Sequence, residues 1–520
     1  MVYQHTENKG VVLMHTLRLL LLTTEYDEQV MNKRFYATSH IHNVLVKHAK
    51  KLLRKISHDS RYEYCRKTYV SLPKKENLSS ADKKYKKQLS QEMKDIRISM
   101  GLSEAGLQSY IKKCARRFSK CLSSQQVQKE ATRVWNGVEK VLFSDGKDIH
   151  FKKNRDFSTI GGKTNTNGVK FNKSELSIEW LGLQIQCKRP KKDAEWDYLT
   201  ESLDHDISYC EIERKMFPNG WHYYVIVYLK GNAPRKTRTV GDNENVTGID
   251  MGISTVATVS DIRVALRELA PDCIRYNKKI QKLLRRMDAS KRKNNPNKYK
   301  PDGTIDKTNR DRWTFSRTYF KNRRKLKSLY RQKSAYIKQF HEILCNELLA
   351  DSVNFITEEM SFKGLQRKAK KTERSDKTAT VRQKNGDTRQ IYKYKKKKRF
   401  GKSLNNRAPA MFLNILERKC SQYDGSLLKV DTKSFRASQY DHVTDTYTKT
   451  SLRERDKQIG GNYVQRDLYS AFLIKNSNPD LNAPDREKCL FEFERFLDMQ
   501  NTLIDTMKQN HISMKSCFGF

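Results

Sequence analysis

Hydrophobic and polar positions change their spacing several times along the chain, and each spacing predicts a different kind of element. The apolar run VVLMHTLRLLLLTT, within residues 10–24, predicts a first strand that feeds a barrel-like domain. From Glu28 onward apolar residues recur at near-helical spacing, which is typical of an amphipathic helix. These positions are Met31, Phe35, Ile41, Val44, Leu45, Leu52 and Leu53.

Two helix starts follow this region. Ser103 is placed to cap one helix, and Ser123 with Gln126 forms a capping box for the next. Apolar residues then form one stripe at Val127, Ala131, Val134, Trp135, Val138 and Val141. We interpret this stripe as a packing face, which leaves the opposite, basic side available for function.

From about residue 142 the pattern becomes an alternation of apolar and polar residues, bounded by Gly, Asn, Asp and Pro. Such runs predict strands joined by hairpin turns, and together they predict a small β-barrel. The runs are KVLFSDGKDIHFKK, ELSIEWLGLQIQCK, HDISYCEIERK and GWHYYVIVYLKG. Residues 231–245 have the Gly, Pro and Asn content of a linker.

Beyond the linker, three carboxylates lie at the ends of strand-like runs. Asp250 lies at the bend of VTGIDMGISTVATVS, Glu358 ends the strand in NFITEEMSF, and Asp467 lies where NYVQRDLYSAFLI changes from strand to helix. They are separated by 108 and 109 residues, so only a fold could bring them together. Three such acids can hold two Mg²⁺ ions and hydrolyse a phosphodiester. For Asp250 alone, an ordinary hairpin-turn Asp is the commoner explanation.

The segments GIDMGIS, ITEEMSFKGL and RDLYSAFLI resemble the three RuvC motifs of the TnpB family and of the compact type V CRISPR effectors, in the same order. The resemblance implies an α+β multidomain protein with an RNase H-like (RuvC) nuclease domain. It also implies that Asp250, Glu358 and Asp467 are the catalytic, Mg²⁺-binding acids. It extends upstream to LSSQQVQKEATRVWNGVEKVLF and FKKNRDFSTIGGK, so it covers most of the chain after about residue 100.

The resemblance also implies a division of the chain into six segments. They are 1–26, the first strand of a wedge domain; 27–141, a helical recognition domain; 142–240, the wedge β-barrel; 241–431, the RuvC domain with motifs I and II and a basic helical insert; 432–462, a reduced target-nucleic-acid-binding insert; and 463–520, motif III with a C-terminal helix.

The net charge of the chain indicates the kind of partner that it binds. The chain has 104 Lys and Arg against 59 Asp and Glu, a formal net charge of +45. Self-repulsion on this scale is relieved by a polyanion, and nucleic acid is the expected partner through phosphate contacts. An anionic membrane is the weaker alternative, because the basic residues are spread over the whole chain rather than along one amphipathic helix.

Basic residues fall into three candidate nucleic-acid-binding groups. One lies near residue 155, and a second lies on a helix predicted over 314–349. An Asn- and Lys-rich stretch, 285–310, precedes this helix, and we expect it to be a mobile connection. The third spans the tract 363–402 and the residues that follow it; for this tract, aromatic stacking with phosphate contact and a flexible polybasic tail are equally good explanations. The candidates are Lys152, Lys153, Arg155, Lys163, Arg323, Arg324, Arg331, Lys363, Tyr394, Lys396, Arg399, Arg436 and Gln439.

Cysteine usage marks a departure from the family. None of the ten cysteines forms a CxxC pair, which favours a reducing compartment and a cytoplasmic prokaryotic protein. The family commonly carries two CxxC pairs between motifs II and III as a zinc ribbon, but residues 440–462 contain no cysteine and His442 is their only histidine. We therefore predict no structural zinc in this chain.

The function predicted from these observations is RNA-guided, Mg²⁺-dependent DNA cleavage, with a guide RNA and target DNA as partners. The N-terminal half would recognise the guide scaffold and a short motif beside the target, and two copies on one RNA are possible. Two alternatives remain: an RNA-independent, structure-specific nuclease of the RuvC class, and a guide-directed DNA-binding repressor that does not cleave.

Overall fold

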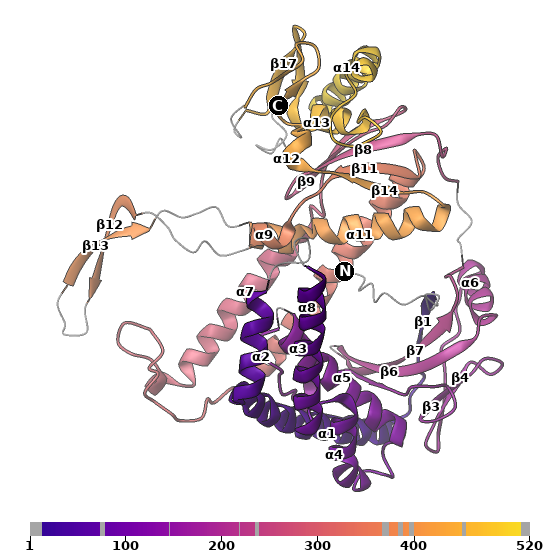
Figure 1. Cartoon of the computed structure of the whole chain (residues 1–520), viewed down its shortest axis with the longest axis vertical. Helices are drawn as coiled ribbons and strands as arrows, with labels where there is room; N and C mark the ends of the chain where they lie inside the picture. The colour runs from indigo at the N-terminus through magenta and orange to yellow at the C-terminus, as the bar shows by residue number, and fades with distance from the viewer. Residues whose placement is uncertain are drawn as a thin grey trace. The chain divides into compact units, whose positions relative to one another are not determined.

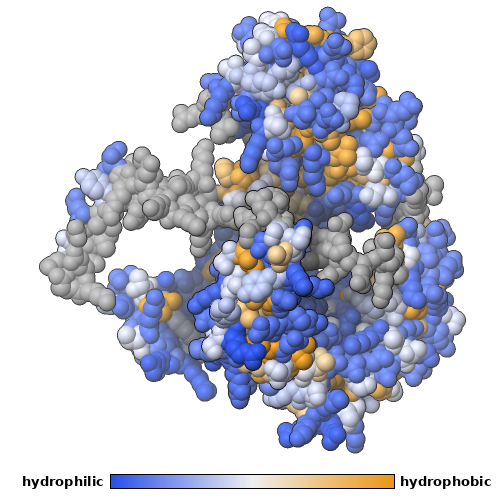
Figure 2. Space-filling model, viewed as in Figure 1, coloured by the Kyte–Doolittle hydropathy of each residue, from blue (hydrophilic) through white to orange (hydrophobic). Residues whose placement is uncertain are grey.

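The structure is a computed structural model, and it describes residues 13–72, 79–144, 146–217, 219–234, 239–366, 374–382, 388–394, 400–449 and 454–510. The chain divides into two compact units, Met1–Lys236 and Thr237–Phe520, and the division falls within the predicted linker. Figure 1 labels helices and strands of both units. Most of the visible surface is hydrophilic (Figure 2), as the charged composition predicts. Among the described residues, no helix is long and apolar enough to cross a membrane.

Unit 1 begins with one strand and continues with five helices. The strand β1 covers Met14–Leu20, and the helices are α1 (Glu25–Ser57), α2 (Ser60–Ser71), α3 (Ser80–Ser99), α4 (Glu104–Arg116) and α5 (Ser124–Phe143). Both predicted helix starts are confirmed. Ser103 accepts the backbone N–H of Gly106 at the start of α4, and Ser123 with Gln126 forms the capping box of α5.

This capping box carries a testable stability prediction. Replacing Ser123 by alanine leaves a backbone N–H of the first turn of α5 without its side-chain acceptor, so we expect the free energy of unfolding to fall by about 1 kcal/mol. Urea denaturation of the full chain measures this. Ser119→Ala is the control, because Ser119 is exposed and precedes the cap. Equal effects of the two substitutions would contradict the capping role.

The rest of unit 1 contains the strands and a short helix. They are β2 (Thr159–Gly161), β3 (Val169–Asn172), β4 (Ser177–Trp180), β5 (Leu183–Gln186), α6 (Asp193–Leu203), β6 (Ile207–Phe217) and β7 (Gly220–Lys230). One sheet has the order β1-β7-β6-β2 and the other β3-β4-β5. The predicted barrel is not found, because among the described residues both sheets are open and one bridge, Leu21 to Cys187, links their strands.

One predicted strand is also absent. The run KVLFSDGKDIHFKK supplies the end of α5, and its residues 146–153 lie in no strand. The side chain of Asn43 accepts the backbone N–H of Lys152 at 2.9 Å and donates to its carbonyl oxygen at 2.9 Å. A side chain of α1 therefore satisfies the backbone groups that a neighbouring strand would otherwise pair.

Helices and strands of unit 1 share one hydrophobic core, in which Phe35, Trp180 and Tyr223 are fully buried. A buried ion-pair network crosses this core. Glu130 on α5 lies 2.6 Å from His42 on α1, while Arg133 bridges Glu130 at 3.2 Å and Glu211 on β6 at 2.8 Å. Arg133 thus pairs with the carboxylates of both Glu130 and Glu211, and these contacts join α1, α5 and β6.

Unit 2 is built on a five-stranded sheet. Its strands are β8 (Val246–Met251), β9 (Thr255–Val259), β10 (Val264–Glu268), β11 (Asn354–Glu358) and β14 (Leu427–Val430), and the sheet order is β10-β9-β8-β11-β14. The first three strands form an antiparallel meander, and β11 pairs in parallel with both β8 and β14. The predicted strands that end near Asp250 and Glu358 are confirmed.

Helices cover both faces of this sheet. On one face lie α8 (Arg317–Leu349) and α11 (Pro409–Cys420), whose Leu344 and Phe412 share a core with Ile249 of β8. On the other face lie α13 (Arg466–Lys475) and α14 (Arg486–Gln509), packed through the buried Phe472 and Phe496. Each face of the sheet therefore has its own hydrophobic core.

The connection from β10 to α8 differs from the prediction. Residues 285–310 were expected to form a mobile connection, but α7 (Cys273–Lys293) occupies their first part. The buried side chain of Asn295 then donates to the carbonyls of Lys291 and Thr314 and accepts the backbone N–H of Thr314. These bonds join the two ends of the connection, so α7 and α8 form a closed helical hairpin.

The remaining elements of unit 2 are short. They are η3 (Pro296–Lys298), α9 (Phe362–Gln366), β12 (Arg374–Arg382), β13 (Thr388–Tyr394), α10 (Gly401–Arg407), α12 (Thr432–Phe435), β15 (Tyr440–Asp441), β16 (Thr446–Tyr447), β17 (Asp456–Ile459) and β18 (Asn462–Gln465). Strands β15 to β18 form two small hairpins in the segment that precedes α13.

Candidate functional site

Side-chain alternation in two neighbouring strands places Asp250 and Glu358 on one face of the sheet. In β8, Ile249 and Met251 belong to the core beneath α8 and α11, so Asp250 and Gly248 point to the opposite face. In β11, Ile356 belongs to the core beneath α13, and Glu358 shares its face. Thr357 is paired with Ile249 in the parallel ladder, so the two acids lie beside each other at the carboxyl ends of adjacent strands.

The third acid reaches the same place from a helix. Asp467 lies in the first turn of α13, and Gln465 caps this helix by accepting the backbone N–H of Leu468 at 2.7 Å. Helix α13 packs directly on β8. This close approach needs Gly248, because a Cβ there would lie 2.1 Å from the carbonyl oxygen of Ala471.

Asp250 and Asp467 line one open pocket of about 700 Å³. Gln439, predicted as a nucleic-acid-binding residue, lines it as well. Arg455 and Arg466 also line it, and neither residue was named from the sequence. Arg466 could have been noticed, since it directly precedes Asp467, but Arg455 is twelve positions away and has no local signal.

Electrostatics link Asp250 to the other two acids. The pKa of Asp250 is raised well above its ordinary value, first by burial and then by the negative charges of Asp467 and Glu358. Burial raises the pKa of Glu358 to about 7. Within the described residues, neither Asp250 nor Glu358 has a side-chain hydrogen bond or ion pair. The two carboxylates are therefore free to accept a cation.

Asp467, unlike Asp250 and Glu358, forms ion pairs with neighbouring arginines. Its Oδ1 lies 3.0 Å from Nη2 of Arg466, and its Oδ2 lies 3.6 Å from Nη1 of Arg455. Across the described parts of the chain, no three His, Cys, Asp or Glu side chains are grouped closely enough to hold a metal ion together. The Asp467 carboxylate is instead paired with these two arginines.

The segment before α13 is held to the core through His442, which is fully buried. Its Nδ1 lies 2.8 Å from the hydroxyl of Tyr469, and its ring lies 4.5 Å from that of Phe493. Arg486 donates to the carbonyl oxygen of His442 at 2.9 Å. The only histidine of this segment is thus a core residue that directly follows β15, in the turn between β15 and β16.

Burial lowers the pKa of His442 to about 4. The unfolded chain takes up this proton near pH 6.5, whereas the folded chain resists it down to about pH 4, so stability falls as the pH drops. We expect a loss of about 2 kcal/mol between neutral pH and pH 5 from this residue. Urea denaturation at pH 7 and pH 5 measures the loss, and His442→Phe should remove most of the difference. An unchanged pH dependence in that variant would contradict the assignment.

The other predicted nucleic-acid-binding residues do not gather at this pocket. Lys152, Lys153, Arg155 and Lys163 are exposed in unit 1. In unit 2, Arg324, Lys363 and Arg436 are exposed, while Arg323 and Arg331 are half-buried on α8. Arg436 lies 6.0 Å over the ring of Tyr447. Tyr394 ends β13, and Lys396 and Arg399 lie outside the described residues.

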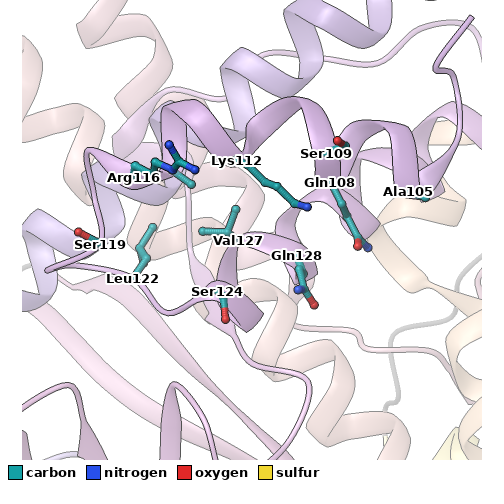
Figure 3. Close-up of a pocket in the computed structure, with 11 residues that line it drawn as sticks. Ala105, Gln108, Ser109, Lys112, Arg116, Ser119, Leu122, Ser124, Val127 and Gln128 are labelled. Carbon is teal, nitrogen blue, oxygen red and sulfur yellow. The ribbon is translucent and has the colours of Figure 1, made fainter.

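Unit 1 contains a second pocket, of about 610 Å³, between α4 and α5 (Figure 3). Leu122 and Val127 supply apolar side chains to it, and Lys112 and Arg116 supply positive charge. The side chains of Gln108 and Lys112 point from α4 toward Gln128 on α5 (Figure 3). The pocket therefore combines an apolar wall with amide and cationic groups.

Solved structures, but no family model and no curated protein, are similar to this chain. No family model matches the chain, and no curated protein matches it. Among solved structures, the chain is similar to a Cas12f1–sgRNA–target DNA complex at 12% identity and a TM-score of 0.42, over 90% of this chain and 99% of that one. It is also similar to a CRISPR-Cas12f ternary complex at 13% identity and a TM-score of 0.25, over 89% of this chain and 99% of that one. Both TM-scores lie below 0.5, so these likenesses do not establish a shared fold.

Proposed function

We propose that this chain is an RNA-guided, Mg²⁺-dependent DNA endonuclease, similar to the TnpB family and the compact type V effectors. The observation that carries the proposal is that Asp250 and Glu358 lie beside each other on one face of the sheet, and that Asp467 lies in the first turn of the helix that packs on this face. They come from two strands and a helix more than 100 residues apart. The mixed five-stranded sheet between two helical layers fits the RNase H-like architecture that the three motifs imply.

The donor set fits divalent cations. Mg²⁺ prefers carboxylate oxygens. The pKa of Asp250 is raised first by burial and then by the charges of Asp467 and Glu358, and a bound cation would offset both effects. Asp250, Glu358 and Asp467 would hold the ions. When bound, two such ions supply an activated water and stabilise the leaving oxygen of a phosphodiester. Asp467 would first exchange its arginine contacts, which frees two guanidinium groups at the pocket wall.

The remaining pocket residues suit a nucleic-acid strand. Arg455, Arg466 and Lys449 provide positive charge beside the acids, and Gln439 provides amide groups. Guanidinium and ammonium groups would hold the phosphates on either side of the reacting one. In unit 1, the basic and amide groups of the pocket between α4 and α5 are a second place for polynucleotide contact. Backbone contacts of this kind leave the choice of sequence to base pairing with a guide.

Sequencing the RNA that copurifies with the full chain tests the guide. We expect one RNA species of defined sequence, and Mg²⁺-dependent cleavage of DNA that is complementary to part of it. Cleavage of DNA without any such RNA would instead support a structure-specific nuclease of the RuvC class. Guided binding of complementary DNA without cleavage, under conditions where Mg²⁺ is saturating, would support a repressor.

A further inference from the structure

Strands β12 and β13 form a two-stranded antiparallel sheet that is separate from the five-stranded sheet of unit 2 (Figure 1). We call this hairpin the ribbon, residues 374–394. Its ladder runs from Arg374, paired with Tyr394, to Arg382, paired with Thr388. The ladder shifts register between Arg374 and Thr378 and is continuous from Thr378 to Arg382. This pairing goes beyond both sequence-based explanations of the tract 363–402, which were stacking aromatics and a flexible tail.

The ribbon has an exposed polar face. The register pairs Thr378 with Tyr392 and Thr380 with Gln390, so these four side chains share one face of the ribbon. All four are exposed, and 55% of Tyr392 is accessible to solvent. An isolated two-stranded hairpin is at best marginally stable in water. A partner that lies along this face would therefore stabilise the ribbon.

Charge indicates an anionic partner. The two strands contain five basic residues and one acidic residue, Asp376. In the sequence, nine more basic residues flank them closely, four within 367–371 and five at 395–399. In the sequence, the two basic flanks adjoin the strand ends at Arg374 and Tyr394, which are paired with each other. This distribution complements the phosphates of a nucleic acid.

Shape then selects the kind of nucleic acid. We propose that the ribbon binds in the major groove of duplex DNA, with its Thr, Gln and Tyr face toward the base edges. The major groove of B-DNA is about 12 Å wide and admits a two-stranded ribbon. Nine residues of β12 extend over roughly 30 Å, close to one turn of B-DNA. The major groove of an RNA duplex is too deep and narrow for side chains to read.

This inference rests on the proposed function only in that the chain binds DNA, and its test measures binding without cleavage. The full chain is titrated, in EDTA, into labelled 20-base-pair DNA and into an RNA duplex of the same sequence, with fluorescence anisotropy as the readout. In one variant, residues 375–393 are replaced by a short Gly-Ser linker, which can span the gap because Arg374 and Tyr394 are paired neighbours.

We expect this variant to bind the DNA duplex at least tenfold more weakly and the RNA duplex within twofold of the parent chain. Equal losses on both duplexes would show that the ribbon acts only as a polycation and would overturn the proposal. An unchanged DNA affinity would overturn it as well. A larger loss on the RNA duplex would assign the ribbon to guide RNA instead.

A second variant keeps every charge. Gln390→Ala with Tyr392→Ala removes two groups from the exposed face, so we expect weaker DNA binding with an unchanged dependence on salt concentration. The matched control is Gln458→Ala with Tyr463→Ala, an exposed Gln–Tyr pair across the ladder of the β17–β18 hairpin. Equal effects of the two pairs, or a reduced salt dependence in the first, would contradict groove contacts at this face.

Discussion

Replacing Asp250 by alanine should reduce Mg²⁺-dependent DNA cleavage by about a thousandfold or more while leaving RNA affinity within twofold. The pKa of Asp250 is raised by burial and by the charges of both other carboxylates. Its loss would remove one of the acids proposed to hold the ions, and metal-ion catalysis contributes several kcal/mol to such reactions. Gel assays of cleavage, together with filter binding of RNA, measure the two quantities separately.

Two further substitutions make the Asp250 experiment specific. Asp480→Ala removes an exposed carboxylate of the same unit and should leave cleavage unchanged. Asp250→Asn keeps the side-chain volume but should be nearly as inactive as alanine, since a neutral amide is a poor Mg²⁺ ligand. Cleavage by either Asp250 variant at the parent rate would refute the assignment of the active site.

Replacing Gly248 by alanine should disrupt unit 2 without altering a charged group. The added Cβ would lie 2.1 Å from the carbonyl oxygen of Ala471 and 2.5 Å from the backbone nitrogen of Lys475. Both are backbone atoms of α13, so the whole helix must move away from β8. We expect the free energy of unfolding to fall by about 3 kcal/mol, and cleavage to fall because Asp467 moves with the helix.

Urea denaturation and the cleavage assay on Gly248→Ala test these effects together. Gly401→Ala is the matched control, because a Cβ at Gly401 meets no atom within 4 Å at the start of α10. Parent-like stability of Gly248→Ala would mean that α13 does not pack on β8 as closely as the structure shows. If Gly248→Ala lost stability but kept full cleavage activity, the close packing of α13 on β8 would not be needed to position Asp467.

Local patterns predicted the elements that carry the acids. The β-branched run after Asp250 became β9, the helical spacing over 314–349 became α8, and the strand-to-helix change near Asp467 became β18 and α13. Each of these signals lies within one short segment, where alternation or helical periodicity is a direct consequence of backbone geometry. The convergence of the three acids was expected from the resemblance, because the sequence pattern contains no distance between them.

Structural features that depend on contacts between residues far apart in the chain could not be predicted from the sequence. Asn43 satisfies the backbone of Lys152 from another element, which removed a predicted strand. Asn295 closes a hairpin by binding Thr314, although its neighbourhood has the composition of a loop. Arg455 reaches Asp467 only because β17 and β18 pair with each other. In each case one polar side chain forms a bond that no local periodicity encodes.

The hydrogen bonds of His442 with Tyr469 and Arg486 have a practical consequence. They attach the small hairpins before α13 to two helices, through Tyr469 of α13 and Arg486 of α14. Because Asp467 lies in the first turn of α13, a change that loosens this attachment would reach the proposed catalytic acid without touching it.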